Sequence, residues 1–298
     1  MNEPSHSYII GAARFEAEPL APGLYVVATP IGNLGDITVR ALSTLAAADT
    51  VLCEDTRTSG KLMERFAIRT KLYPYHEHNA QKVRPQIIER LKQGATIALI
   101  SDAGMPLVSD PGYRLVKEAA ELGIPVTACP GASAVLTGLA LSGLPTDRFL
   151  FAGFVPQKQG ERKRLFEDFS KLKATLIFFE SPHRIVETLH DVANQLPGRA
   201  VAVTRELTKL HEEVLRGPAA EIAATLEARP SVKGEITLLI GPPTEDEVVP
   251  EAEIDAAIAE AVAAMPASKA ASEVAKRFHL NRSDIYQRIL DLKGQDGA

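Results

Sequence analysis

Cysteine is scarce in this sequence, and its scarcity limits which sites the chain can build. The 298 residues include two cysteines, Cys53 and Cys129, which are too few for a disulfide framework or a four-thiolate metal site. His76 and His78 lie close together, but zinc needs a third protein ligand at a regular spacing and none follows. We therefore expect no metal site, and a reducing, cytoplasmic setting fits the composition.

Long apolar runs and an excess of positive charge are also absent. The amino terminus has no basic segment ahead of an apolar run, so it predicts neither a signal peptide nor an anchor. Prolines and glycines divide the uncharged residues 124–146 into pieces too short to cross a bilayer. The formal net charge is −5, so nucleic-acid binding would have to use local patches. We expect a soluble protein that has no membrane partner.

Three common active-site motifs are missing as well. No G-x-G-x-x-G follows the first predicted strand, and no G-x-x-x-x-G-K-[ST] occurs, which argues against a standard dinucleotide site and a P-loop. No G-x-S-x-G turn is present, so a serine hydrolase has little support.

What the sequence does contain is the pattern of an α/β protein. Apolar, β-branched runs alternate with segments of helical periodicity, which predicts parallel sheets. The first series has strands at 24–28, 50–53, 96–101 and 125–129, and helices at 36–47, 81–93, 113–122 and 132–141. The second series has strands at 149–154, 175–179, 200–204 and 235–240, and helices at 159–172, 184–195 and 219–228. Continuous apolar strands indicate burial on both faces, so helices should cover both sides of the first sheet.

These patterns divide the chain into five parts. Residues 211–216 could add an antiparallel strand to the second series, which makes a mixed sheet plausible there. A proline pair followed by an acidic run, beginning at Pro242, indicates a linker. The divisions are a flexible amino-terminal arm (1–22), a parallel α/β domain (23–144), a mixed α/β domain (145–242), a linker (243–250) and a helical region (251–298).

The helical region resembles a helix-turn-helix. Its helices are predicted at 251–264, 268–278 and 282–292, with Leu280-Asn281 at the last turn. Residues 268–293 carry six basic and three acidic side chains, which suggests a surface that faces nucleic acid. A small capping bundle with an ordinary solvated face explains the same charges equally well.

Four unusual turns mark the place where a ligand should bind. In a parallel sheet, ligands bind outside the carboxyl ends of the strands. The segments that follow the four strands of the first series, 29–36, 54–57, 102–112 and 130–133, are rich in glycine, proline and carboxylates. Ordinary loop chemistry explains any one of them, but four at one edge favour a binding site.

These turns belong to a longer set of motifs that resembles a known family. The motifs are residues 24–38, 53–57, 101–106, 109–112, 130–134, 179–184, 205–209 and 234–237. In them the sequence is similar to the ribosomal RNA small subunit methyltransferase I family, of the tetrapyrrole methylase superfamily. The resemblance implies methyl transfer from S-adenosylmethionine to the ribose 2′-hydroxyl of a cytidine in the decoding region of 16S rRNA. It also implies a homodimer that acts on 16S rRNA or the small ribosomal subunit, with the methyl donor in a cleft between the two α/β domains.

The resemblance also suggests which residues contact the cofactor. They are Pro30, Asp102, Met105, Pro106, Ala132, Ser133, Phe179, Glu235, Ile236 and Thr237. Relatives that methylate tetrapyrroles or a protein side chain share these loops, so the loops specify the methyl donor better than the acceptor.

The chemistry of ribose methylation adds two further groups of candidates. Positioning alone supplies about 7–11 kcal/mol in favourable cases, but a ribose hydroxyl is a poor nucleophile and benefits from a general base. The unranked candidates for the base are Glu54, Asp55, Asp110, His183 and Glu206. Arg57, Arg184, Arg205 and Lys209 are suited to RNA phosphates, although structural salt bridges are the commoner explanation for each.

Two other functions stay open on the sequence alone. One is a methyltransferase of the same superfamily that acts on a small molecule such as a tetrapyrrole. The basic carboxyl-terminal helices and the arginine-bearing motifs argue against it. The other is a non-catalytic RNA-binding module in ribosome assembly, and the intact glycine and carboxylate turns argue against that.

Overall fold

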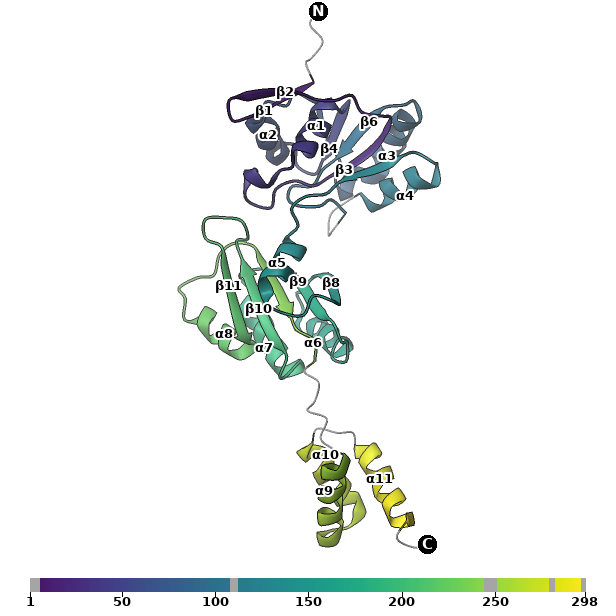
Figure 1. The fold of residues 1–298 in the computed structure, drawn as a ribbon, viewed down its shortest axis with the longest axis vertical. Coiled ribbons are helices and arrows are strands. Elements are labelled where there is room, and N and C mark those ends of the chain that lie inside the picture. Colours follow the sequence, from purple (N-terminus) through teal and green to yellow (C-terminus); the bar gives the residue numbers. More distant parts are fainter. Residues whose placement is uncertain (1–5, 108–111, 244–250, 279–281, 296–298) are drawn as a thin grey trace, which may run out of the picture. The chain divides into compact units, whose positions relative to one another are not determined.

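The chain forms two compact units, Met1–Pro242 and Pro243–Ala298. The computed structural model describes residues 6–107, 112–243, 251–278 and 282–295 (Figure 1). Among the features expected from the sequence, Asp110, nearly all of the linker and the turn at Leu280-Asn281 lie outside the described residues.

The first sheet of the larger unit is parallel, as the sequence predicted. Its strands are β3 (Gly23–Val27), β4 (Thr50–Cys53), β5 (Leu72–Pro74), β6 (Thr96–Leu99) and β7 (Val126–Cys129). They run in the order β5-β4-β6-β3-β7, and each neighbouring pair is parallel. The edge strand β5 was not anticipated, because it is short and ends in Pro74, and proline is tolerated only at a sheet edge.

Helices cover both faces of this sheet. They are α1 (Val39–Ala47), α2 (Thr56–Arg65), α3 (Glu77–Lys92) and α4 (Tyr113–Glu121). Leu45 and Met63, from α1 and α2, pack on one face, and Leu91 and Leu115, from α3 and α4, pack on the other. Helix α1 begins later than the expected residue 36, because the Thr38 hydroxyl caps it by accepting from Ala41 N. A short 3₁₀ turn, η1 (Leu34–Asp36), precedes it.

The amino-terminal residues differ from the loose arm expected for 1–22. Strands β1 (Ser7–Ile10) and β2 (Ala13–Glu16) form an antiparallel hairpin. Tyr8 stacks on Phe15 with 5.5 Å between ring centroids and is buried against the α1 and α2 side of the core. Each strand has four residues, too short a pattern to predict from alternation alone.

The second sheet is mixed, and it includes the extra antiparallel strand that the sequence suggested. Its strands are β8 (Phe149–Phe154), β9 (Thr175–Glu180), β10 (Ala200–Arg205), β11 (Glu213–Pro218) and β12 (Ile236–Ile240). Their order is β11-β10-β12-β9-β8. Strands β8 and β9 are parallel, and the other three neighbouring pairs are antiparallel.

Helices also lie on both faces of the second sheet. Helices α6 (Gln159–Asp168), α7 (Ile185–Gln195) and α8 (Ala219–Glu227) share one core, in which Phe166, Leu189 and Ile222 are buried. Helix α5 (Ala134–Ser142) packs Val135 and Leu139 against a separate cluster on the sheet. The sequence division had placed this helix with residues 23–144. Its nearly uniform apolar composition gave no sign of which sheet it would cover.

The smaller unit is helical, as expected. Its helices are α9 (Glu251–Ala264), α10 (Ala267–Arg277) and α11 (Arg282–Gln295). Ile258, Val274 and Ile289 form its core, and Arg288 pairs with Asp255 at 2.6 Å. None of the helices in the described part of the chain is long and apolar enough to span a membrane.

Candidate active site

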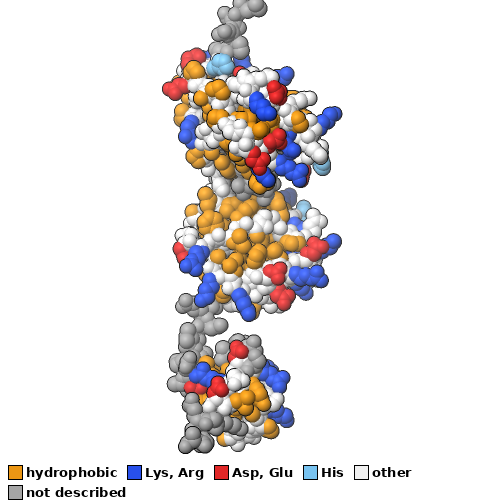
Figure 2. Space-filling model, turned by 90° about the vertical axis from the view of Figure 1, so that its right-hand side faces the viewer, with side chains coloured by type: hydrophobic (Ala, Val, Ile, Leu, Met, Phe, Trp, Pro, Cys, Tyr) orange, Lys and Arg blue, Asp and Glu red, His pale blue; other side chains and the backbone are white. Residues whose placement is uncertain are grey.

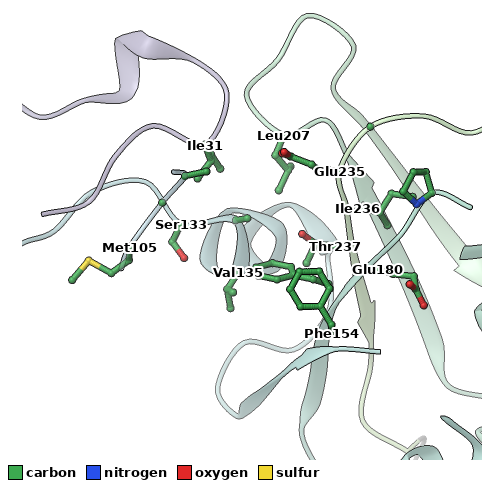
Figure 3. A pocket seen from close by; sticks show the side chains of 16 residues that line it. Ile31, Met105, Ser133, Val135, Phe154, Glu180, Leu207, Glu235, Ile236 and Thr237 are labelled. Atoms are coloured by element: carbon green, nitrogen blue, oxygen red, sulfur yellow. The ribbon is translucent and has the colours of Figure 1, made fainter. Parts of the chain in front are cut away.

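A cavity of about 370 Å³ lies in the larger unit, where the carboxyl edge of the first sheet meets α5 and the second sheet. We call it the first cavity. Figure 3 shows Ile31 and Met105 on one side of it, and Leu207, Glu235 and Ile236 on the other. Its lining residues are Ile31, Ala103, Gly104, Met105, Ser133, Ala134, Val135, Phe154, Phe179, Glu180, Pro182, Leu207, Gly234, Glu235, Ile236 and Thr237.

Aromatic rings form one wall of the first cavity. The Phe179 ring lies edge to face against Phe154 and Phe151, with centroid distances of 5.4 Å and 4.9 Å. Most of the remaining lining is aliphatic, and Ser133 and Thr237 add hydroxyl groups. A concave, mostly apolar site with a few polar groups is typical of small-molecule binding. Aromatic faces of this kind suit a flat heterocycle.

Glu180 forms a buried, fully paired part of the wall. Its Oε1 accepts from Ser181 N at 2.6 Å and pairs with Arg184 Nη2 at 2.7 Å, while Oε2 accepts from Thr188 Oγ1 at 2.6 Å. These bonds compensate for the loss of water around the carboxylate. Arg184, which the sequence suggested for RNA, is therefore engaged by a carboxylate of the cavity wall.

A second cavity of about 320 Å³ adjoins the first, and Ile31, Ala103 and Glu235 line both. Its remaining lining residues are Thr29, Pro30, Gly32, Leu34, Thr58, Ser59, Lys61, Leu62, Ser101, Asp102 and Lys209. Thr29 and Gly104 exchange backbone hydrogen bonds of 2.9 Å and 3.1 Å. This bridge fixes the loop after β3 against the loop after β6, so both loops can present side chains to one space.

The loop after β10 closes one side of both cavities. Lys209 Nζ lies 2.9 Å from both Glu206 Oε1 and Glu235 Oε2, and Asn33 N donates to Thr208 Oγ1 at 3.1 Å. The hydrogen bond from Lys209 holds the pKa of Glu206 below its ordinary value. Glu206 and Thr208 have φ values of 52° and 64°, a region that costs energy for residues other than glycine. The loop is thus held by contacts with both sheets.

The expected cofactor residues divide among three places. Met105, Ser133, Phe179, Glu235, Ile236 and Thr237 line the first cavity. Pro30 and Asp102 line the second cavity, and Pro106 and Ala132 line neither. Ten residues that line the first cavity were not among the predicted cofactor contacts. Eight of them lie inside the motifs named above, so the sequence carried a signal for them: Ile31, Ala103, Gly104, Ala134, Glu180, Pro182, Leu207 and Gly234. Val135 and Phe154 lie outside the motifs and carried none.

The candidates for the general base are not brought together. Glu54 and His183 are exposed and line neither cavity. Asp55 caps α2 and binds Arg57 at 2.6 Å, and these contacts with Arg57 lower the pKa of Asp55 to about 2. Glu206 is held by Lys209. Of these candidates, the four that fall within the described residues all lie outside the cavity linings.

The four cations suggested for RNA all have carboxylate partners. Arg57 pairs with Asp55 but is 88% exposed, so this contact costs little to exchange for a phosphate. Arg205 Nε lies 3.0 Å from Glu213 Oε2, and Arg184 and Lys209 are paired as described above. The geometry leaves Arg57 as the member of this group most available to an external anion.

Glu213 gives the larger unit a pH-dependent stability. Hydrogen bonds from Arg229 lower the pKa of Glu213 from 4.5 to about 2. Partial burial of the carboxylate acts in the opposite direction, and a hydrogen bond from Arg205 lowers the pKa further. A carboxyl with a depressed folded pKa stabilises the protein above its unfolded pKa, and this stabilisation is lost as the pH falls toward the folded pKa. We expect Glu213→Gln to cost about 1–2 kcal/mol at neutral pH, allowing for solvent screening.

Urea denaturation at several pH values measures this effect. The gap in unfolding free energy between wild type and Glu213→Gln should shrink as the pH falls from about 5 to about 2, because the Glu213 carboxylate becomes protonated across that range. Glu64→Gln, at an exposed position on α2, is the matched control and should show no such change. A constant gap across the range would contradict the role given to Glu213.

No metal site is apparent in the described ranges. The rings of His76 and His78 lie 6.0 Å apart, but no group of three or more His, Cys, Asp or Glu side chains among the described residues is placed to hold an ion.

Comparisons with protein families give two matches that together cover most of the chain. Residues 23–223 match the family described as Tetrapyrrole (Corrin/Porphyrin) Methylases. Residues 248–293 match the RsmI C-terminal HTH domain. The first match contains most of the residues that line the two cavities.

Curated relatives are similar over nearly their whole length. A protein of Mesorhizobium japonicum named ribosomal RNA small subunit methyltransferase I is 51% identical, over 97% of this chain and 98% of its own. A protein of the same name from Vibrio cholerae is 43% identical, over 92% of this chain and 96% of its own.

Solved structures share the fold at lower identity. A diphthine synthase matches with a TM-score of 0.57 and 16% identity, over 73% of this chain and 89% of its own. Uroporphyrin-III-C-methyltransferase from Thermus thermophilus matches with a TM-score of 0.51 and 20% identity, over 74% of this chain and 94% of its own.

Proposed function

We propose that this protein methylates the ribose 2′-hydroxyl of a cytidine in the decoding region of 16S rRNA. The chain belongs to the ribosomal RNA small subunit methyltransferase I family, within the tetrapyrrole methylases. It is an S-adenosylmethionine-dependent methyltransferase. The family relationship supports ribosomal RNA as the acceptor. The choice of the ribose 2′-oxygen and of a cytidine goes beyond this relationship and is the proposal's own part.

The observation that carries the proposal is that a cavity with an aromatic wall adjoins a second cavity lined by several hydroxyl and charged side chains. The first cavity fits the methyl donor, because Phe154 and Phe179 offer aromatic surface for an adenine. Ser133 Oγ caps α5 by accepting from Leu136 N, and its proton stays available to a ligand. The second cavity shares a wall with the first, so an acceptor there would lie next to the donor.

The protein's part in the reaction is to align and shield the reactants. When bound, S-adenosylmethionine supplies a methyl group on a positively charged sulfur, which is already activated for transfer. The loop that holds Lys209 covers the space where the two cavities meet. Excluding water there and fixing the acceptor along the transfer direction are the effects that proximity catalysis requires.

The smaller unit supports an RNA substrate. It matches a helix-turn-helix domain found in this family, and Lys269 and Lys276 are exposed on α10. Local basic side chains of this kind can contact phosphates even though the whole chain is acidic. We propose that this unit helps to hold ribosomal RNA in the cytoplasm, where the substrate is found.

We also propose that the enzyme is a homodimer. Large apolar side chains are exposed on the larger unit, among them Leu136, Phe149 and Phe154. Figure 2 shows hydrophobic side chains gathered on one face of the part that carries the second sheet. A patch of this kind favours association. Sedimentation equilibrium should give twice the chain mass of 32.1 kDa, and a monomer at micromolar concentration would contradict the proposal.

One assay tests the proposed function. The protein is incubated with methyl-labelled S-adenosylmethionine and small ribosomal subunits that lack the modification, and labelled nucleotides are mapped. We expect one ribose-labelled cytidine in the decoding region. Label on a base, or only on a tetrapyrrole offered in parallel, would contradict the proposed acceptor. Tight RNA binding without transfer would favour the non-catalytic alternative.

A further inference from the structure

The loop that closes one side of both cavities carries two leucines with opposite surroundings. Leu207 is 7% exposed and lines the first cavity, on the same side as Glu235 (Figure 3). Leu210, three residues later, is 93% exposed. Among the large hydrophobic side chains of the described residues this is the greatest exposure, and the next, Tyr113, is 67% exposed. The loop thus turns one leucine into the protein and presents the other to solvent.

The backbone on both sides of Leu210 is held in place. Lys209 N donates to Glu206 O at 3.0 Å, and Glu212 N donates to Lys209 O at 3.2 Å. A Cβ at Gly32 would lie 2.6 Å from Lys209 Cγ, so the loop after β3 supports this loop closely. A tip that is already ordered loses little conformational entropy when a partner binds to it.

The tip also presents no negative charge. Four carboxylates lie in or beside the loop, and each is engaged by a donor of the protein: Glu206, Glu212, Glu213 and Glu235. The two residues at the tip, Leu210 and His211, are exposed. The tip therefore offers a partner apolar and imidazole surface, without a carboxylate of its own to repel phosphates.

Leu210 lies at the rim of the active site. Leu207 lines the first cavity and Lys209 lines the second, so the residue after Lys209 borders the space where the methyl donor and the acceptor ribose have to meet. Cavities of about 370 Å³ and 320 Å³ have room for single small molecules and not for a stacked run of bases. The acceptor nucleotide therefore has to leave the stack of its neighbours before its ribose can enter.

An exposed leucine at this place suits insertion into RNA. Proteins that unstack bases commonly insert an apolar side chain between them, and leucine is one of the residues used. We propose that Leu210 is such a wedge: it inserts into the base stack of ribosomal RNA beside the acceptor nucleotide and fills the gap left when that nucleotide turns into the active site. This inference rests on the proposed function. RNA is the favoured occupant because Leu210 borders the active site of a chain that belongs to a ribosomal RNA methyltransferase family.

Leu210→Ala tests the wedge by steady-state kinetics on small ribosomal subunits that lack the modification. We expect kcat/KM to fall about 10- to 100-fold, which corresponds to about 1.4–2.8 kcal/mol and is comparable to the burial of one leucine side chain. The melting temperature and the dissociation constant of S-adenosylmethionine should not change, because the side chain is 93% exposed. Leu210→Met, which keeps an apolar side chain of similar volume, should retain most of the activity.

The matched control is Leu172→Ala. Leu172 is 38% exposed and lines neither cavity, so the same truncation there should leave kcat/KM for the ribosomal substrate unchanged.

Fluorescence of 2-aminopurine tests the unstacking itself. The probe replaces a base beside the acceptor in RNA that is then assembled into small subunits, and its emission rises when stacking is lost. We expect wild type and Leu172→Ala to raise the emission on binding, and Leu210→Ala to raise it much less at saturating protein. Equal emission with Leu210→Ala and wild type, or no rise with wild type, would show that Leu210 does not open the stack.

Two kinetic results and one hydrodynamic result would also overturn the assignment. Wild-type kcat/KM in Leu210→Ala excludes a wedge, and so does a loss in Leu210→Met as large as that in Leu210→Ala. A sedimentation mass of Leu210→Ala that differs from that of wild type would assign Leu210 to a contact between copies of the chain. These outcomes leave the proposed function standing. If wild type labels no ribose, the proposed function itself fails and the wedge fails with it.

Discussion

Phe179→Ala is expected to raise the dissociation constant of S-adenosylmethionine about 10- to 100-fold, or about 1.4–2.8 kcal/mol. The Phe179 ring contacts the rings of Phe151 and Phe154 edge to face, and Phe179 lines the first cavity. Removing it deletes the contact with the heterocycle, worth about 0.5–1.5 kcal/mol, in addition to the buried area. It also frees Phe154 to move, because their edge-to-face contact is lost. Calorimetric titration measures the change.

The matched control is Phe15→Ala. Phe15 is 43% exposed on the hairpin strand β2 and lines neither cavity, so the same truncation there should leave affinity for the methyl donor unchanged. Thermal denaturation of both variants separates a binding effect from a loss of folded protein. Equal affinities for Phe179→Ala and wild type would show that the aromatic wall does not contact the donor.

Gly234→Ala is expected to reduce methyl transfer about 10- to 100-fold, which corresponds to about 1.4–2.8 kcal/mol. A Cβ at this position would lie 2.4 Å from Glu206 Cγ, and the φ of +95° is unfavourable for alanine. The clash would push Glu206 away from Lys209 and from Glu235 N, which donates to Glu206 Oε1 at 3.0 Å. The loop that closes both cavities would then lose its anchor, and the β12 end of the first cavity would shift.

Gly123→Ala separates the clash from backbone strain. Gly123 also has a positive φ, +71°, but a Cβ there would meet nothing within 4 Å. We expect this variant to lose about 1 kcal/mol of stability at most and to keep its activity. Steady-state kinetics on both variants, with circular dichroism to confirm folding, makes the comparison. Wild-type kinetics in Gly234→Ala would contradict the role given to the loop.

Most of the fold could be predicted from the sequence, because its strands are continuous apolar runs between clear helix ends. The parallel first sheet and the antiparallel strand β11 of the second sheet both agree with the pattern. The hairpin of β1 and β2 could not be predicted, since its strands are short and its burial depends on packing against α1 and α2. Helix α5 was placed with the wrong sheet for a similar reason, because an almost wholly apolar helix does not reveal its partner.

The candidate site was predictable in part. The motifs identify loops, and Met105, Ser133 and Phe179 do line the first cavity. They do not reveal which side of a loop each residue occupies, so Asp102 and Pro30 appear in the second cavity instead. The distinction depends on the bridge between Thr29 and Gly104, a contact between distant segments that no local pattern encodes.

A crystal structure of the protein with S-adenosylhomocysteine tests the central claim most directly. We expect the adenine against Phe179 in the first cavity and the sulfur directed toward the second cavity. A ligand whose adenine lies away from Phe179, or that binds outside both cavities, would contradict this account.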